Sequence, residues 1–327
     1  MRGAGLTRLA ALLPLLLGCA GPGRAPEFEA MAAREIAAHP RRYTFGDGRA
    51  VLISRDGVPR GLIWGTMHVA YGDDTALPRP VRDRFSEASS LLVEYDYGQM
   101  PRADRLRHQR RWAAASLGAD QAALARLDPA TRAALDGANL PAGSLSRYSL
   151  LGLSRLVTAR ANRGAPASPT PQIGQVDGLL ARFAQNRGIP VRSLEDERHP
   201  LDVLYGGDPN GPEAASDLRS ALLCANDVPE FGRWAQAAYA QGRVAALNAA
   251  ATAFCADPSE APLMDRMRER VFTARNAVMA ERIDAALAQP GFHFVAVGAG
   301  HLLGADGVPA LLQARGWTVT PCPGDRC

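Results

Sequence analysis

Two apolar segments that lie far apart in the sequence each end in Gly-x-x-His. Residues 61–68 read GLIWGTMH, and residues 292–301 read FHFVAVGAGH. A short apolar run that stops at glycine is typical of a buried strand entering a tight turn, because glycine gives the backbone the freedom that the turn needs. In an open α/β sheet such turns lie at the carboxyl ends of the strands, where ligands bind. We therefore expect His68 and His301 to lie at one edge of the same sheet.

A carboxylate ends a third apolar run. Residues 91–93 are Leu-Leu-Val, and Glu94 follows directly, with Asp96 on the same face by strand alternation. Two imidazoles and a carboxylate at one sheet edge could bind a metal ion or act as acid and base. The alternative for His68 and His301 is that each satisfies backbone groups of its own turn. The alternative for Glu94 is a buried pair with an arginine.

Five blocks of the sequence carry a resemblance to a known family. In chain order they are GTMH at 65–68, LLVEYD at 91–96, the segment 174–195 that opens with GQVDGLL and closes with PVRSLE, the pair Arg275-Asn276, and FVAVGAGHLLG at 294–304. Together they resemble the TraB/PrgY/GumN family, whose animal relatives are the Tiki metalloproteases and whose fold is related to those of erythromycin-esterase-like and ChaN-like proteins. The match covers nearly the whole mature chain.

The resemblance implies a catalytic role for four residues. His68, Glu94 and His301 would bind a divalent metal ion or share acid and base duty. Arg275 would neutralise the developing oxyanion. Imidazole and carboxylate ligands suit manganese, cobalt, zinc or iron, so the identity of the metal stays open. For the best-understood relatives the reaction is metal-dependent peptide cleavage.

The same resemblance implies contacts with a substrate. The turn glycines Gly65 and Gly298 are expected to lie against it, together with Asn276 and Asp177. Asp177 has a second interpretation, as a helix cap. Glu195 also matches a family position and closes a strand, and a structural role and a site role are equal alternatives for it.

The cations of the chain are all arginines, because the sequence contains no lysine. This excludes a P-loop lysine, a lysine Schiff base and a catalytic Ser-Lys pair. The formal charge of +4 comes from arginines dispersed among acidic residues, so nucleic-acid binding is not indicated. The glycines of residues 298–304 depart from the dinucleotide-binding spacing, and neither His-Glu-x-x-His nor Gly-x-Ser-x-Gly occurs in the sequence.

The N-terminus has the features of an export signal. Arg2 and Arg8 precede an apolar stretch, residues 9–17, that is too short to span a bilayer. Leu-Leu-Gly-Cys at 16–19 resembles a bacterial lipobox, which predicts a signal peptide over 1–18, a lipidated Cys19 and a tether over 19–40. Because alanine follows the cysteine, the resemblance places the anchored protein in the outer membrane, facing the periplasm. Ordinary signal cleavage, which would give a soluble periplasmic protein, is the alternative.

Four cysteines remain once Cys19 is set aside, and an even number in an exported chain indicates disulfides. The favoured pairs are Cys224 with Cys255, across a helical hairpin, and Cys322 with Cys327, closing a loop at the tail. Sequence alone allows three connectivities. A zinc site is the competing interpretation, but the spacing lacks Cys-x-x-Cys pairs.

Residues 41–327 predict one α/β domain with a mixed central sheet whose strands end in the Gly-x-x-His turns. Turn residues between the β-prone runs 42–45 and 50–54 predict an antiparallel meander at the start of the sheet. Regions rich in alanine, leucine and arginine predict large helical insertions at about 101–163 and 212–289. The last strand, its GAGH turn and the helix and strand that follow predict a terminal βαβ unit.

Three functions follow from these patterns. The first is an exported, lipid-anchored, metal-dependent hydrolase of peptide or protein substrates. The second is a non-catalytic periplasmic protein that binds a peptide or another ligand in the same cleft; PrgY-type relatives, which act on a peptide pheromone, are compatible with either. The third is a metal-free hydrolase that uses histidine and glutamate as acid and base, as the erythromycin-esterase-like relatives do. The oligomeric state is not predicted.

Overall fold

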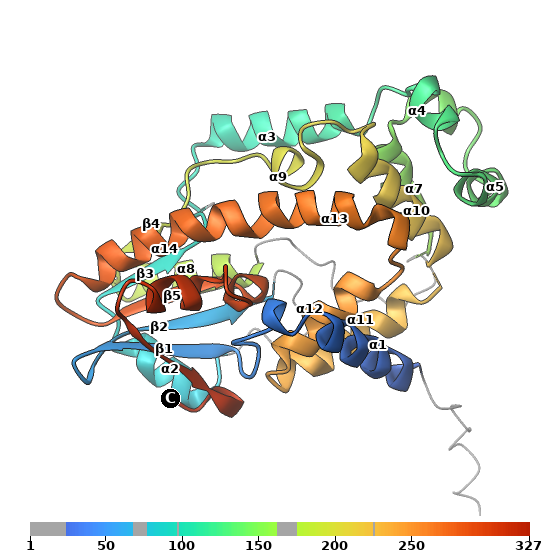
Figure 1. Cartoon of the computed structure of the whole chain (residues 1–327). Coiled ribbons are helices and arrows are strands. Elements are labelled where there is room, and N and C mark those ends of the chain that lie inside the picture. Colours follow the sequence, from blue (N-terminus) through green and yellow to red (C-terminus); the bar gives the residue numbers. More distant parts are fainter. Residues whose placement is uncertain (1–23, 68–76, 97, 162–174, 225) are drawn as a thin grey trace, which may run out of the picture.

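The computed structural model describes residues 24–67, 77–96, 98–161, 175–224 and 226–327, with the backbone alone for 161 and 175–177. The expected signal peptide, Cys19 and His68 lie outside these residues. Six strands are present in the described chain: β1 (Ala50–Arg55), β2 (Val58–Thr66), β3 (Ser90–Val93), β4 (Val191–Ser193), β5 (His293–Gly298) and β6 (Thr318–Cys322). They form one sheet in the order β4-β3-β5-β2-β1-β6 (Figure 1). The predicted mixed α/β sheet is confirmed.

The middle of the sheet is parallel and apolar. Strands β4, β3, β5 and β2 run in one direction, while β1 is antiparallel to both of its neighbours, β2 and β6. All six residues of β5 are buried, as the unbroken apolar run predicts for a strand covered on both faces. Asp56 and Gly57, both with positive φ, form the tight turn between β1 and β2.

Helices cover both faces of this sheet. One face packs against α14 (Ala274–Leu287) and α15 (Val308–Gln313), and the other packs against α2 (Arg79–Ser86) and α8 (Gln175–Asn186). Figure 1 shows α14 and α2 on opposite sides of the strands. The result is a three-layer α/β/α core.

The predicted helical insertions form two lobes beside this core. The first, which we call the α7/α10 lobe, contains α3 (Arg102–Ala115), α4 (Gln121–Ala125), α5 (Pro129–Gly137), α6 (Ser144–Arg147), α7 (Leu150–Ala161), α9 (Pro200–Tyr205) and α10 (Pro212–Leu223). The second, the α1/α12 lobe, contains α1 (Ala25–Ala38), α11 (Val228–Ala240) and α12 (Val244–Ala253). Among the described residues, no helix is long and apolar enough to cross a membrane.

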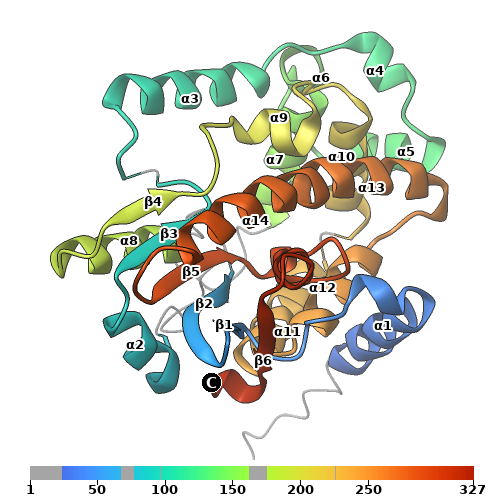
Figure 2. The ribbon, with the colours of Figure 1, turned by 60° about the vertical axis from the view of Figure 1, so that its left-hand side comes forward.

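One long helix joins the lobes to the sheet. It begins as α13 (Ala261–Arg268), widens into a π-helical turn, η5 (Glu269–Thr273), and continues as α14. Figure 2 shows α13 and α14 running between the two lobes and onto the sheet. A π-helical turn inside an α-helix is frequent at functional sites.

The structure differs from the expected elements in three places. Residues 42–45 form no strand. The 3₁₀ turn η1 (Pro40–Arg42) ends at the first of them, and Phe45 has a positive φ that ends any extended run. Strand β6 does not lie beside β5, because α15 carries the chain past β2 and β1 to the far edge of the sheet. Within the expected tether, residues 25–38 form α1, which buries Phe28 and Ala32 against the α1/α12 lobe.

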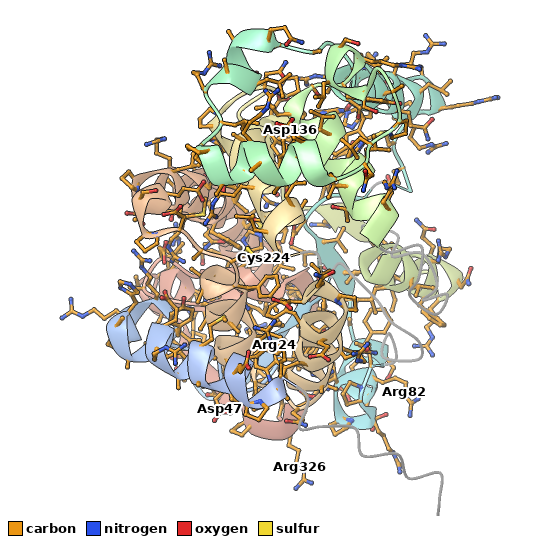
Figure 3. The ribbon with its side chains drawn as sticks, turned by 90° about the vertical axis from the view of Figure 1, so that its right-hand side faces the viewer. Arg24, Asp47, Arg82, Asp136, Cys224 and Arg326 are labelled. Atoms are coloured by element: carbon orange, nitrogen blue, oxygen red, sulfur yellow. A yellow bond between two sulfur atoms is a disulfide. The ribbon has the colours of Figure 1, made fainter. Side chains whose placement is uncertain are left out.

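Both favoured disulfides are formed. Cys224–Cys255 joins the end of α10 to the segment after α12, so it links the two lobes, and Cys224 lies at their junction in Figure 3. Cys322–Cys327 closes the loop that follows β6. This loop carries Asp325, which forms a buried ion pair with Arg49 at the start of β1.

The two disulfides should differ in their contribution to stability. Their sequence separations are 31 and 5 residues, and a longer loop loses more unfolded-state entropy when it is closed. The loop relation gives about 4 kcal/mol for Cys224–Cys255 and about 2 kcal/mol for Cys322–Cys327. Urea unfolding of the two Cys→Ser double variants measures the difference, and a greater loss for the short loop would contradict the expectation.

Candidate functional site

Strand register brings the predicted edge residues together. Thr66 of β2 pairs with Gly298 of β5, so the two Gly-x-x-His segments begin side by side. Val93 of β3 pairs with Ala296 on one side and Ser193 of β4 on the other. Glu94 therefore follows its strand between the ends of β5 and β4.

Glu94 is buried and held through both of its carboxylate oxygens. It is 9% exposed. Oε1 accepts the backbone N–H of Gly298 at 2.6 Å, and Oε2 accepts a hydrogen bond from Nη2 of Arg275 at 2.7 Å. The two expectations for this residue, a site position and a buried pair with an arginine, are therefore compatible.

Arg275, in the first turn of α14, lies between two carboxylates. Its Nε donates to both oxygens of Glu195, at 3.0 and 2.9 Å, and its Nη2 is shared between Glu195 and Glu94. Nη1 donates to the carbonyl of Val271, in the π-helical turn, at 3.0 Å. Burial by itself lowers the pKa of the guanidinium, but the hydrogen bonds to Glu195 and the charges of both glutamates outweigh it and hold the pKa above its ordinary value.

A chain of hydrogen bonds fixes the tautomer of His301. The amide Nδ2 of Asn276 donates to the backbone carbonyl of Asp306 at 2.8 Å, so its Oδ1 faces His301 Nδ1, at 2.5 Å. Because Oδ1 can only accept, Nδ1 of His301 carries a proton. Its other ring nitrogen, Nε2, lies 3.6 Å from Oε1 of Glu94.

The charge of this cluster is unbalanced. Glu94 and Glu195 bring two negative charges and Arg275 brings one positive charge, and all three are largely buried.

The donor atoms fit part of a metal site. His301 donates Nδ1–H to an amide oxygen and turns Nε2 toward a carboxylate, which is the orientation that a metal-binding histidine usually has. The described residues contain no group of three or more histidine, cysteine, aspartate or glutamate side chains that could hold a metal ion. His68, the third ligand expected from the sequence, lies outside the described residues.

Comparison with known proteins decides the family. The TraB/PrgY/gumN family model matches residues 51–321, most of the chain. The chain belongs to this family. No curated protein and no solved structure matches it.

The other expected site residues have varied settings. Gly65 is in close contact with the second turn, since a Cβ there would lie 2.7 Å from Leu302 Cδ1, and its carbonyl accepts the Tyr239 hydroxyl at 2.7 Å. Gly298 and Asn276 contact Glu94 and His301, as described above. Asp96 is buried, and its Oδ2 has no hydrogen-bond partner among the described residues. Asp177 lies in α8, and its side chain is outside the described part of the chain.

Several contacts of this site have no recognisable pattern in the sequence. Phe272 packs edge-on to His301, with ring centroids 5.2 Å apart, and Asp306 orients Asn276 through its backbone. A hydrogen bond to a backbone carbonyl, such as that of Asp306, cannot be recognised from the amino-acid sequence. Val271 lies four residues before Arg275, so helical spacing could have placed it near that side chain.

Because Arg275 is buried, its removal should strongly lower the stability of the fold. Arg275→Ala would leave two buried carboxylates without their cation, and it should lower the free energy of unfolding by about 3–5 kcal/mol. Arg282→Ala is the matched control in the same helix, because its partner Asp196 has a side chain that is 85% exposed; it should cost less than about 1 kcal/mol. Urea denaturation of both variants measures the contrast, and similar losses would contradict a buried cluster.

Proposed function

We propose that this protein is an exported hydrolase of peptide bonds, with His301 and Glu94 as its catalytic residues. The observation that carries the proposal is the buried pair of His301 Nε2 and Glu94 Oε1, 3.6 Å apart, with each side chain fixed from behind by its own hydrogen bonds. A side chain whose tautomer and orientation are fixed in advance needs little reorganisation during the reaction.

The two residues have complementary roles in this proposal. Nε2 of His301 accepts a proton from the attacking water, and the carboxylate of Glu94 stabilises the imidazolium that results. His301 then returns the proton to the leaving amine, so that one histidine serves first as base and then as acid. Asn276 keeps Nδ1 protonated throughout, because its oxygen accepts from that nitrogen.

Arg275 fits a positioning role better than direct contact with an oxyanion. Its Nε and both N–H groups of Nη2 are bound to Glu195 and Glu94, and one N–H of Nη1 is bound to Val271. One further N–H of Nη1 has no partner among the described contacts. Arg275 and Glu195 would then hold Glu94 in place for the reaction.

In the metal-dependent form of the proposal, His301 Nε2 and Glu94 Oε1 would instead hold a divalent metal ion together with His68. The metal would lower the pKa of its bound water toward neutrality, and Nε2 would then be a ligand in place of the base. The metal-free hydrolase is the second candidate, because His301 Nε2 and Glu94 Oε1 lie close enough to act as a base and its stabilising carboxylate without a metal ion.

Peptide cleavage by the full-length, detergent-solubilised protein tests the proposal. Incubation with a broad peptide library should give fragments, and His301→Gln and Glu94→Gln should lower kcat by roughly 10²–10⁴-fold. His39→Gln, whose side chain is 43% exposed, is the control that should leave the rate unchanged. Peptides that are retained intact would support the non-catalytic binding protein in place of a hydrolase.

Removal of metal separates the two hydrolase candidates. After exhaustive chelation, a metal-dependent enzyme should be inactive and should recover with manganese, cobalt, zinc or iron, with stoichiometric binding that is lost in His68→Ala and His301→Ala. Activity that survives chelation and still requires His301 would identify the metal-free reaction.

The proposal includes a lipid anchor at Cys19. The wild-type chain should partition with membranes, because a diacyl anchor with an additional acyl chain far exceeds the weak binding of a single chain. Cys19→Ser should lose acyl labelling. A soluble, unacylated wild-type protein would refute the anchor and leave ordinary export to the periplasm.

A further inference from the structure

A hollow of about 470 Å³ lies where the two helical lobes meet the long helix. Residues from α10 and the end of α9 form one wall, the end of α12 and the segment after it form the second, and α13 with its π-helical turn forms the third. The Cys224–Cys255 disulfide ties the first wall to the second.

The hollow adjoins the catalytic cluster through two residues of the π-helical turn. Phe272 lines the hollow, and its ring packs edge-on against His301 at 5.2 Å. Val271 also lines the hollow, and its carbonyl binds Arg275. If the backbone of a bound peptide lies at Glu94 and His301, a neighbouring side chain of that peptide can therefore extend into the hollow.

The walls of the hollow are mostly apolar and flexible. Met264, Met267 and Val271 follow one face of the long helix at intervals of three and four residues. Phe254 and Leu204 face them from the other walls. These side chains can pack around the alkyl part of a long ligand side chain, since methionine adapts to the shape of what it contacts.

The charged residues of the hollow are predominantly acidic, with five carboxylates and two guanidinium groups. Four of the carboxylates form ion pairs with arginines: Glu213 with Arg270 at 2.9 Å, Asp257 with Arg219 at 3.3 Å, Glu260 with Arg219 at 3.8 Å and Asp265 with Arg42 at 3.2 Å.

Asp217 is the exception among these carboxylates. Its Oδ2 accepts hydrogen bonds from the hydroxyls of Ser154, at 2.7 Å, and Tyr205, at 3.3 Å, and no ion pair joins it to a described residue. The charge of Asp217 raises the pKa of the Arg155 guanidinium, but burial lowers it by more. That guanidinium stacks on the Trp112 ring, 4.0 Å from its centroid, and forms no ion pair with Asp217 among the described contacts. The carboxylate thus lacks a close cation at a half-buried position.

We propose that this hollow binds the side chain of an arginine or lysine in a peptide, with Asp217 as the counter-ion and the methionine and phenylalanine side chains around the alkyl stem. A long cationic side chain matches a space with apolar walls and an uncompensated carboxylate. The role as a specificity pocket rests on the proposed peptidase function, but the binding of the cation does not.

The experiment uses pairs of acetylated hexapeptides that differ at one position, arginine against citrulline and lysine against norleucine. These pairs keep the size of the side chain and remove its charge. The full-length protein in detergent should bind the charged member roughly ten- to a hundredfold more tightly by calorimetry, as expected for a charge-assisted hydrogen bond. If the protein also cleaves these peptides, kcat/KM should show the same preference.

Asp217→Asn provides the decisive variant, because the amide oxygen can still accept from Ser154 and Tyr205. It should abolish the preference for the charged peptide and leave the affinity for citrulline and norleucine peptides unchanged. Asp257→Asn is the matched control that should keep the preference, because Asp257 lines the same hollow and is already paired with Arg219. Thermal unfolding verifies that both variants are folded.

The outcomes separate this proposal from the proposed reaction. Charge-selective binding without cleavage would support the pocket and overturn the hydrolase. Cleavage without any difference within a peptide pair, or a preference that persists in Asp217→Asn, would overturn the pocket and leave the hydrolase intact.

Discussion

The burial of one guanidinium between two carboxylates organises the core of this molecule. Arg275 binds Glu94 at the end of β3 and Glu195 after β4, so a single side chain of α14 ties the ends of two neighbouring parallel strands together. Removing three charges from water is costly, and such a group persists only when its hydrogen bonds are nearly complete. Here the geometry meets that demand, because both oxygens of each glutamate are bound. The long helix is consequently held against the carboxyl edge of the sheet.

The second constraint is the close packing at the carboxyl ends of β2, β5 and β3. Gly65 has no room for a Cβ beside Leu302, and Gly298 presents its N–H to Glu94. The parallel register of β5 with β3 brings the N–H at the end of β5 next to the carboxylate that follows β3. The π-helical turn then supplies two neighbours of the cluster, the carbonyl of Val271 and the ring of Phe272. The site therefore depends on backbone groups as much as on the side chains that the family motifs contain.

The central strands of the sheet are easier to predict from the sequence than the segments that surround them. The runs that end at Gly65, Glu94 and Gly298 are almost wholly apolar, and such runs are typical of parallel strands that are covered on both faces. The run at 42–45 contains β-prone residues but lies in a turn, because local propensity is weak against the packing of Gly46 on Ala245. The position of β6 could not be predicted, since the path of α15 across the sheet depends on which faces remain uncovered.

The sequence by itself determined the apolar strands of the sheet, the family and the convergence of Glu94 with His301, because strand periodicity and turn chemistry are local properties. Only the tertiary structure decided that Arg275 lies between Glu94 and Glu195 and that Asn276 sets the tautomer of His301. It also decided that Asp217 forms no ion pair within the described part of the chain, while its neighbours are paired. These contacts join residues from different elements, and their partners are chosen by how the helices pack onto the sheet and onto each other.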